Sequence, residues 1–191
     1  MFDDGYRAIY DVLISSRAEV CNSVYIFCGA GKIGDINDWD TSGELAGETL
    51  LSWEQIAELR ARGVRFGSHS LTHVDLTKLG ESELEREIKE SKEILEEKLN
   101  ETIEGFAYPY GFFNERVIRA VRNAGYRWAV TTSDSIWEGR GNPYRMRRIN
   151  ISGLNPDWLL RAKLNGLYDI KALWELPRLL WEKVVLSMKG K

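Results

Sequence analysis

The only two histidines of the chain, His69 and His73, stand four residues apart and could share a metal ion. On a helical turn, positions i and i+4 lie on one side, with Cβ atoms about 5–6 Å apart. The pair directly follows residues 64–67, a predicted strand, and strand ends are where a (β/α) barrel places its ligands. The alternative is a pair of polar histidines in a capping turn. We favour a metal site because the chain uses both of its histidines at this spacing.

A second candidate segment is the acidic pair Asp3-Asp4 near the start of the chain. Catalytic metal sites usually have three protein ligands and leave one position for water, so a carboxylate would complete the histidine pair. Adjacent residues of an extended segment point apart, so the two acids should have different roles. One would bind the metal, and the other would accept a proton from the activated water. The alternative is an ordinary Asp-Gly turn.

A third candidate segment, Tyr108-Pro109-Tyr110-Gly111, ends a predicted strand at 104–108. Proline and glycine are common in plain turns. The same residues could instead form a rigid loop that presents backbone N–H groups and aromatic walls to a ligand. The residues by themselves leave both interpretations open.

Alternating helices and strands must position these segments. Parallel strands with helices outside them are therefore expected. The helix from Ser52 should begin with a capping box to Gln55, and the helix from Ser82 with a capping box to Glu85. The charged positions of the latter helix are expected to face solvent. The glycine-rich loop at 29–51 is long enough to be functional. The remaining predicted elements are helices at 6–18 and from Asn114 to Gly125, and strands at 23–28, 126–132 and 146–151.

Length and composition exclude several classes of protein. The 191 residues suit one domain, and a net charge of -3 with mixed signs argues against a nucleic-acid partner. Cys21 and Cys28 form no metal-binding pair and are interpreted as small apolar residues. There is no signal peptide and no apolar run of about 20 residues, so we expect a soluble, cytoplasmic chain.

Three segments together resemble the polysaccharide deacetylases, the NodB-homology group also known as carbohydrate esterase family 4. The group includes chitin, peptidoglycan and Nod-factor deacetylases. The resemblance covers about residues 1–151, and three motifs in this order are specific. The motifs are Phe2-Asp3-Asp4-Gly5-Tyr6, Ser68-His69-Ser70-Leu71-Thr72-His73 and Phe106-Ala107-Tyr108-Pro109-Tyr110-Gly111.

The resemblance implies a distorted (β/α) barrel that removes N-acetyl groups from an amino-sugar polymer or oligosaccharide. It implies one divalent metal ion, with zinc expected and cobalt or nickel as alternatives. By position, Asp4, His69 and His73 are the metal ligands and Asp3 is the catalytic base. Tyr110, between Pro109 and Gly111 in the substrate-binding loop, would offer its backbone N–H to the oxyanion. The partner is then an N-acetylated carbohydrate.

Three features depart from the family pattern. Ala107 stands where many members have an arginine that steadies the base. No third histidine is present to act as general acid, so that role is unassigned, and protonated Asp3 could deliver the proton. No strand precedes Phe2, so we expect the barrel to lack its first strand in this sequence and the natural chain to begin upstream of Met1.

Arg148 is the candidate replacement for the missing arginine. In the predicted strand at 146–151, isoleucines occupy one face, and Arg148 shares the other with Asn150. A charge in the barrel interior is tolerated only when it is paired. Arg148 would then substitute for the arginine absent at Ala107 and keep Asp3 ionised. The alternative is a surface arginine on an edge strand.

The expected organisation is a catalytic domain at 1–151 and a helical extension at 152–191 packed on it. Tryptophan and leucine recur with lysine and arginine in the extension, so contact with a membrane surface is the alternative to packing. The rival functions are a non-catalytic carbohydrate-binding relative and an amidase that acts on a small molecule. The sequence does not indicate an oligomeric state.

Overall fold

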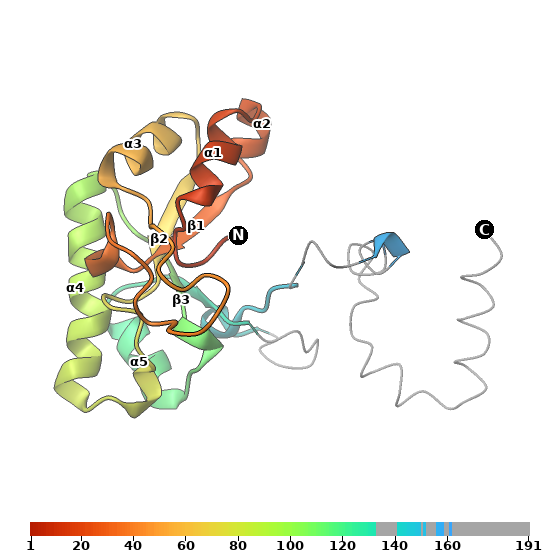
Figure 1. Ribbon diagram of the computed structural model, residues 1–191. Helices are drawn as coiled ribbons and strands as arrows, with labels where there is room; N and C mark the ends of the chain where they lie inside the picture. Colours follow the sequence, from red (N-terminus) through yellow and green to blue (C-terminus); the bar gives the residue numbers. More distant parts are fainter. Residues whose placement is uncertain (133–140, 150, 152–155, 159–160, 162–191) are drawn as a thin grey trace, which may run out of the picture. The chain divides into compact units, whose positions relative to one another are not determined.

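The computed structural model describes residues 1–132, 141–149, 151, 156–158 and 161 (Figure 1). The chain divides into two compact units, the first formed by residues 1–131 and 139–146, the second by residues 132–138 and 147–191. The predicted helical extension at 152–191 lies almost entirely outside the described residues, so its boundary and its packing stay predictions. No helix among the described residues has the length and apolar character needed to span a bilayer.

The first unit is built on a parallel sheet whose strands follow one another in chain order, β1-β2-β3-β4. Sequential parallel strands joined by crossovers are the winding of a (β/α) barrel, and the described residues supply four strands of it. The prediction of parallel strands is confirmed. The strands are Tyr25–Cys28 (β1), Arg65–Ser68 (β2), Gly105–Ala107 (β3) and Trp128–Val130 (β4).

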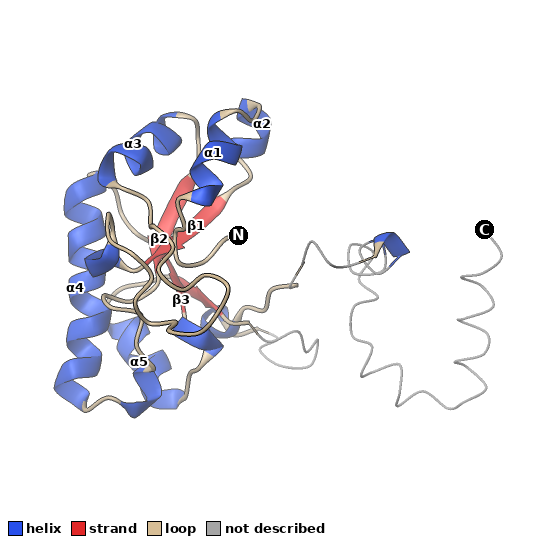
Figure 2. Ribbon diagram, viewed as in Figure 1, coloured by secondary structure: helices blue, strands red, loops and turns tan. Residues whose placement is uncertain are grey.

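The helices pack along one face of these strands, as expected (Figure 2). The capping box of α3 is present, because Ser52 accepts from the Gln55 amide and the Gln55 side chain accepts from the Ser52 amide. The α-helices are Ala8–Ile14 (α1), Ala18–Cys21 (α2), Trp53–Ala61 (α3), Glu81–Leu99 (α4) and Glu115–Asn123 (α5). Short 3-10 turns are Ala30–Lys32 (η1), Leu76–Lys78 (η2), Pro109–Gly111 (η3) and Pro143–Arg145 (η4).

The capping box predicted at Ser82 and Glu85 is wrong. The extended residue before α4 is Gly80, which gives no side-chain cap, so Ser82 already lies inside the helix. The Leu84 amide donates to the Gly80 carbonyl at 2.9 Å, and Leu84 is fully buried. The helix therefore begins earlier than the capping signal at Ser82 predicted, and in this helix Leu84 is part of the core.

The sheet is buried on both faces, as the apolar strands predict. Ile26 and Cys28 face the helices, and Cys21 and Cys28 are both free and buried, as predicted. The opposite face carries Tyr25 and Phe27, with Ala107, Val130 and Trp128. A Cβ at Gly67 would lie 2.7 Å from the Phe27 ring, so glycine is required there for the aromatic rings to cover β2.

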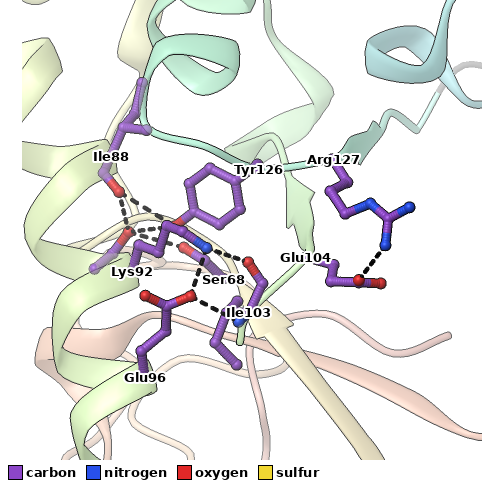
Figure 3. Close-up of polar contacts among 9 residues, drawn as sticks. Ser68, Ile88, Lys92, Glu96, Ile103, Glu104, Tyr126 and Arg127 are labelled. Carbon is purple, nitrogen blue, oxygen red and sulfur yellow. Dashed lines mark hydrogen bonds and ion pairs between the residues drawn. The ribbon is translucent and has the colours of Figure 1, made fainter. Parts of the chain in front are cut away.

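α4 is tied to the segment that leads into β3 by polar contacts (Figure 3). Lys92 donates to Glu96 at 2.6 Å and also to the Ile103 carbonyl, and the Ile103 amide donates to the same Glu96 oxygen at 2.9 Å. The Lys92 ammonium lies 4.9 Å from the centre of the Tyr126 ring. α4 is therefore fixed against the sheet by charge-assisted hydrogen bonds as well as by its apolar face.

The start of the chain lies against the edge of β1 that β2 does not occupy. Phe2 forms a parallel bridge with Ile26, in which the Phe2 amide donates to Tyr25 and the Phe27 amide donates to Phe2, both at 2.9 Å. A single bridge thus stands where the resemblance places a first strand. The bridge carries residues 3 and 4 to the same end of the sheet as the end of β2.

The strand predicted at 146–151 is wrong beyond its first residue. Met146 forms a single parallel bridge with Val130, and residues 147–149 and 151 are not in a strand. Asn150 lies outside the described residues. The boundary between the two units falls after Met146, so the chain passes from one unit to the other where the pairing ends.

Candidate metal centre

Asp4 reaches the end of the sheet on a tight turn. Asp4 and Gly5 both have left-handed backbones, with φ of 67° and 72°, and the Gly5 amide donates to the Asp3 carbonyl at 2.8 Å. A Cβ at Gly5 would lie 2.7 Å from the sulfur of Cys28. The Asp-Gly turn considered as an alternative is therefore present, and it is this turn that aims Asp4 at the histidines.

His69 and His73 do come together, but not on the helical turn that their spacing predicted. They lie in a loop after β2, in which Ser70 and His73 have left-handed φ values of 66° and 60°. Backbones of this kind cost about 1–3 kcal/mol each and persist only when their surroundings hold them. The two rings are 4.8 Å apart between centroids, and both side chains are buried.

Three candidate ligand atoms converge on one point. One carboxylate oxygen of Asp4, Oδ1, lies 3.4 Å from His69 Nε2 and 3.1 Å from His73 Nε2. The ligand atoms of the three residues all lie within 4.8 Å of one another, the only such group of histidine, cysteine and acidic residues found in the described part of the chain. The structure thus brings together the three residues predicted to bind metal.

The hydrogen bonding of His69 indicates that this point suits a cation. His69 Nδ1 lies 2.8 Å from the Ala107 carbonyl, which can only accept, so Nδ1 donates and a neutral ring presents its Nε2 lone pair to Asp4. Asp4 Oδ1 is buried and has no hydrogen-bond donor. Two acceptors in contact repel each other unless a positive charge lies between them. A divalent ion or bound protons would supply that charge, and His and Asp donors are those that zinc takes.

The local field also favours positive charge. Burial by itself would raise the pKa of Asp4, yet the two imidazoles beside it hold that pKa well below its usual range. Burial by itself would lower the pKa of His69, but the adjacent carboxylates of Asp4 and Asp3 raise it. At both groups the attraction between imidazole and carboxylate therefore outweighs desolvation.

Asp3 and Arg148 are the two residues predicted to act in catalysis without binding the metal. Asp3 is half-buried, and its negative charge acts on His69, which places it near the cluster. Arg148 belongs to the second unit, so its predicted pairing with Asp3 stays a prediction. The position of the absent arginine, Ala107, is buried, and its carbonyl is the partner of His69.

The substrate-binding loop predicted at 109–111 borders the same cluster. Tyr110 has a left-handed φ of 58°, and its ring meets that of His73 edge-on, with centroids 4.7 Å apart. Its side chain is 45% exposed, so it offers an apolar face to solvent beside the candidate ligands. Phe112, 52% exposed, extends this surface. The loop is therefore both a turn and an aromatic wall.

Trp39 was not identified from the sequence. It lies in the loop at 29–51, which was expected to be functional, and its ring stacks on His73 with centroids 4.4 Å apart. Buried Asn37 holds this part of the loop, because its amide nitrogen donates to the Tyr6 hydroxyl at 2.8 Å and to the Leu45 carbonyl at 2.9 Å. An aromatic residue in a long glycine-rich loop was the available signal.

The aromatic rings enclose a cleft of about 410 Å³ beside His73. This volume lies within the range of about 300–1,000 Å³ that is usual for small-ligand sites. The charged and hydroxyl-bearing aliphatic residues of the lining, together with His73, come from the segment at 72–78, which includes η2. The lining residues are Trp39, Thr72, His73, Val74, Asp75, Lys78, Tyr110 and Phe112.

Glu87 is a second residue that the sequence did not reveal. The charged positions of α4 were expected to face solvent, but Glu87 is only 3% exposed. Its carboxylate accepts hydrogen bonds from the Leu71 and Thr72 amides at 3.0 and 2.9 Å, and from the Thr72 hydroxyl at 2.6 Å. The prediction that this charge faces solvent is wrong, because the carboxylate is buried and accepts hydrogen bonds from the loop.

Comparisons with known proteins identify the family of the chain. Residues 1–129 match the model of a family described as polysaccharide deacetylase. The chain is 26% identical over 151 residues to YxkH of Bacillus subtilis, which carries the name polysaccharide deacetylase. It is 29% identical over 126 residues to a chitooligosaccharide deacetylase of Rhizobium leguminosarum bv. trifolii. These matches cover 79% and 60% of this chain, but only 50% and 59% of the two relatives.

Solved structures show the same fold. The Streptococcus pyogenes deacetylase PplD in complex with acetate superposes with a TM-score of 0.68 at 22% identity, over 87% of this chain and 68% of that one. IcaB from Ammonifex degensii gives a TM-score of 0.64 at 24% identity, over 80% and 66% of the two chains. The predicted (β/α) barrel class is thereby confirmed, and the family match, which spans most of the sequence, shows that the chain belongs to the polysaccharide deacetylase family.

Proposed function

We propose that this chain is a metal-dependent hydrolase that removes N-acetyl groups from an amino-sugar polymer or oligosaccharide. The observation that carries the proposal is the convergence of Asp4 Oδ1 with the two Nε2 atoms of His69 and His73. The family match supports it, and the names of the relatives point to acetylated saccharides. The ion expected is zinc, with cobalt or nickel as alternatives, because imidazole and carboxylate ligands suit all three.

The residues divide the chemistry among them. A divalent ion at such a site polarises a carbonyl and lowers the pKa of water. Asp3, beside the ligand Asp4, is the proposed base that takes the proton of the attacking water. The backbone N–H of Tyr110 is the proposed donor to the oxyanion, where preorganised donors have their largest effect. Asp3, once protonated, can return the proton to the leaving amine.

The aromatic cleft supports a saccharide as substrate rather than a small linear amide. Trp39, Tyr110 and Phe112 line the cleft beside His73, and flat apolar rings suit the C–H surfaces of a sugar ring. Exposed rings cost solvation free energy unless a ligand covers them. Pro109 and Gly111 fix the wall that carries Tyr110, in keeping with the predicted role of the 109–111 loop.

One observation favours a non-catalytic carbohydrate-binding relative. Both histidines of the chain lie in the metal cluster, so no histidine remains to protonate the leaving amine. Against this alternative, a protein that only binds sugar has no need of the second carboxylate, Asp3, beside a ligand. Acetate release separates the two functions.

Acetate release from chitooligosaccharides and from peptidoglycan fragments tests the proposal. We expect release from at least one of them, its loss after chelation, and its recovery when zinc is added back. An acetylated small amide serves as the control for the amidase alternative. Saccharide binding without any acetate release would support the binding relative, and release that persists in chelator would exclude the metal mechanism.

A further inference from the structure

Hydrogen bonds to α4 hold the loop that carries both histidines. Glu87 accepts from the amides of Leu71 and Thr72, the two residues between the left-handed positions of the loop. Its second oxygen accepts from the Thr72 hydroxyl, so both oxygens of the carboxylate are engaged. The His73 amide then donates to Ser70 Oγ at 3.0 Å, which closes the loop on itself.

α4 also reaches Ser68, the last residue of β2 and the first of the segment 68–73 that carries both histidines. Ser91 lies one turn beyond Glu87 on the same helix, and it shares a hydrogen bond of 2.9 Å with Ser68. Ser68 in turn accepts from the Ser70 amide at 3.2 Å. Residues at i and i+4 share a helix face, so one strip of α4 contacts the loop at two points. Tyr126 supports this strip through the Ile88 carbonyl (Figure 3).

The chemistry of Glu87 indicates more than packing. Burying a carboxylate is costly, and none of the ion pairs formed within the described residues includes Glu87. The carboxylate is stabilised instead by donors of the loop. Packing alone would be served by an apolar side chain, such as those of Leu84 and Ile88 on the same helix. A buried carboxylate whose hydrogen bonds all go to one loop indicates that the conformation of that loop matters for function.

We propose that Glu87 is a positioning residue, which holds the loop between His69 and His73 and thereby sets the distance of both rings from Asp4. The proposal rests on the metal site proposed above. Groups that orient metal ligands, although they do not touch the ion, typically change metal affinity by about 10–100-fold when they are removed. Glu87 acts through the backbone of the loop rather than on an imidazole.

The test compares Glu87→Leu with Glu87→Gln. Leucine fills the space but accepts no hydrogen bond, whereas glutamine keeps one acceptor oxygen and can donate to the Thr72 hydroxyl. In a competition titration with a chromophoric chelator, we expect zinc affinity to fall about 10–100-fold in Glu87→Leu and less than about 10-fold in Glu87→Gln. The control, Glu90→Leu, alters an exposed glutamate of the same helix and should leave zinc affinity unchanged.

Hydrogen exchange of the metal-free protein gives a readout that does not depend on the ion. The amides of Leu71 and Thr72 should exchange faster in Glu87→Leu than in wild type and be largely protected again in Glu87→Gln. If Glu87→Leu does not fold, Thr72→Val removes one donor to the carboxylate and should weaken zinc binding a few-fold while speeding exchange of the Thr72 amide.

The outcomes are distinct. A folded Glu87→Leu that binds zinc as wild type does, with only a lower melting temperature, would overturn the proposal and leave Glu87 a structural role. An equal loss of affinity in Glu90→Leu would also overturn it, because the effect would then come from charge at a distance. Unchanged zinc affinity and exchange in Thr72→Val would do the same. Wild-type protein that binds no zinc would instead refute the proposed function, and the exchange data would still decide whether Glu87 holds the loop.

Discussion

The histidine loop, residues 68–73, and the acidic segment, residues 2–5, meet at one point but are held in different ways. Ser68 and Ser70 in the loop are fully buried, and α4 contacts it through Glu87 and Ser91. The acidic segment is held by a bridge at Phe2, which is 43% exposed, by a turn at Gly5, and by the Leu51 amide, which donates to the Gly5 carbonyl at 2.8 Å.

This difference suggests a division of labour. A loop fixed by several buried hydrogen bonds can keep two imidazoles in place before a metal ion binds. The acidic segment is held through its backbone at Phe2 and Gly5, and it carries Asp3, the group proposed to take up and give back a proton. Metal affinity should therefore depend mainly on the loop, and turnover mainly on the acidic segment.

The largest effect is expected from the histidine loop. A double variant, His69→Ala with His73→Ala, leaves one ligand of three, so elemental analysis should find the metal content reduced from about one ion per chain to almost none. Asp4→Asn, which keeps both histidines, should retain measurable though weaker binding. A double variant with a full equivalent of metal would disprove the site, and equal losses in the two proteins would remove the distinction between the segments.

Replacement of Asp3 should lower activity without lowering the metal content. Asp3→Asn removes the proposed base and keeps its size, so kcat should fall about 10²–10⁴-fold, the usual contribution of general acid–base catalysis, while metal content stays unchanged. Asp11→Asn on α1 is the matched control, because that side chain is 63% exposed. If Asp3→Asn loses metal together with activity, Asp3 belongs with the ligands, and the roles of the two acids need to be reassigned.

The turn at Gly5 should be the weak point of the acidic segment. Gly5→Ala places a Cβ 2.7 Å from the Cys28 sulfur and forces alanine to a φ of 72°. Gly34→Ala imposes a similar backbone cost, with φ of 84°, but meets nothing within 4 Å. The left-handed backbone costs about 1–2 kcal/mol in both, and overpacking adds about 1–3 kcal/mol only at Gly5. Denaturant unfolding measures the difference, and equal losses would show that Cys28 can move aside.

Local sequence patterns predicted most of the strands and several of the helix starts. The apolar runs predicted the strands β1 to β4, the capping box predicted the start of α3 at Ser52, and the helix predicted from Asn114 is α5. These features depend on residues within a few positions of one another. At 146–151 the pattern failed, because a strand also needs a neighbouring strand, and in this range the structure assigns a β-bridge to Met146 but no strand to residues 147–149 and 151.

The candidate site was predictable in its members but not in its geometry. The spacing of His69 and His73 suggested a helical turn, whereas Ser70 and His73 adopt left-handed backbones that only long-range contacts can hold. Glu87 is fifteen positions from the nearest amide that it binds, that of Thr72, and most of the residues beside it on α4 are charged and exposed. Its own residue type therefore suggests a surface position, whereas Trp39 had one local signal, an aromatic residue in a long glycine-rich loop.

The smallest effect is expected at Trp39, which contacts the histidine loop from the solvent side. Its ring stacks on His73 and lines the aromatic cleft, so Trp39→Ala should mainly weaken saccharide binding. An aromatic contact contributes about 0.5–1.5 kcal/mol beyond its buried area, which predicts a KM about 2–10-fold higher for chitooligosaccharides with kcat nearly unchanged. Leu45→Ala, at an exposed position of the same loop, is the control. If Trp39→Ala instead lowers zinc affinity and leaves KM unaltered, the ring supports His73, and the histidine loop depends on contacts from both sides.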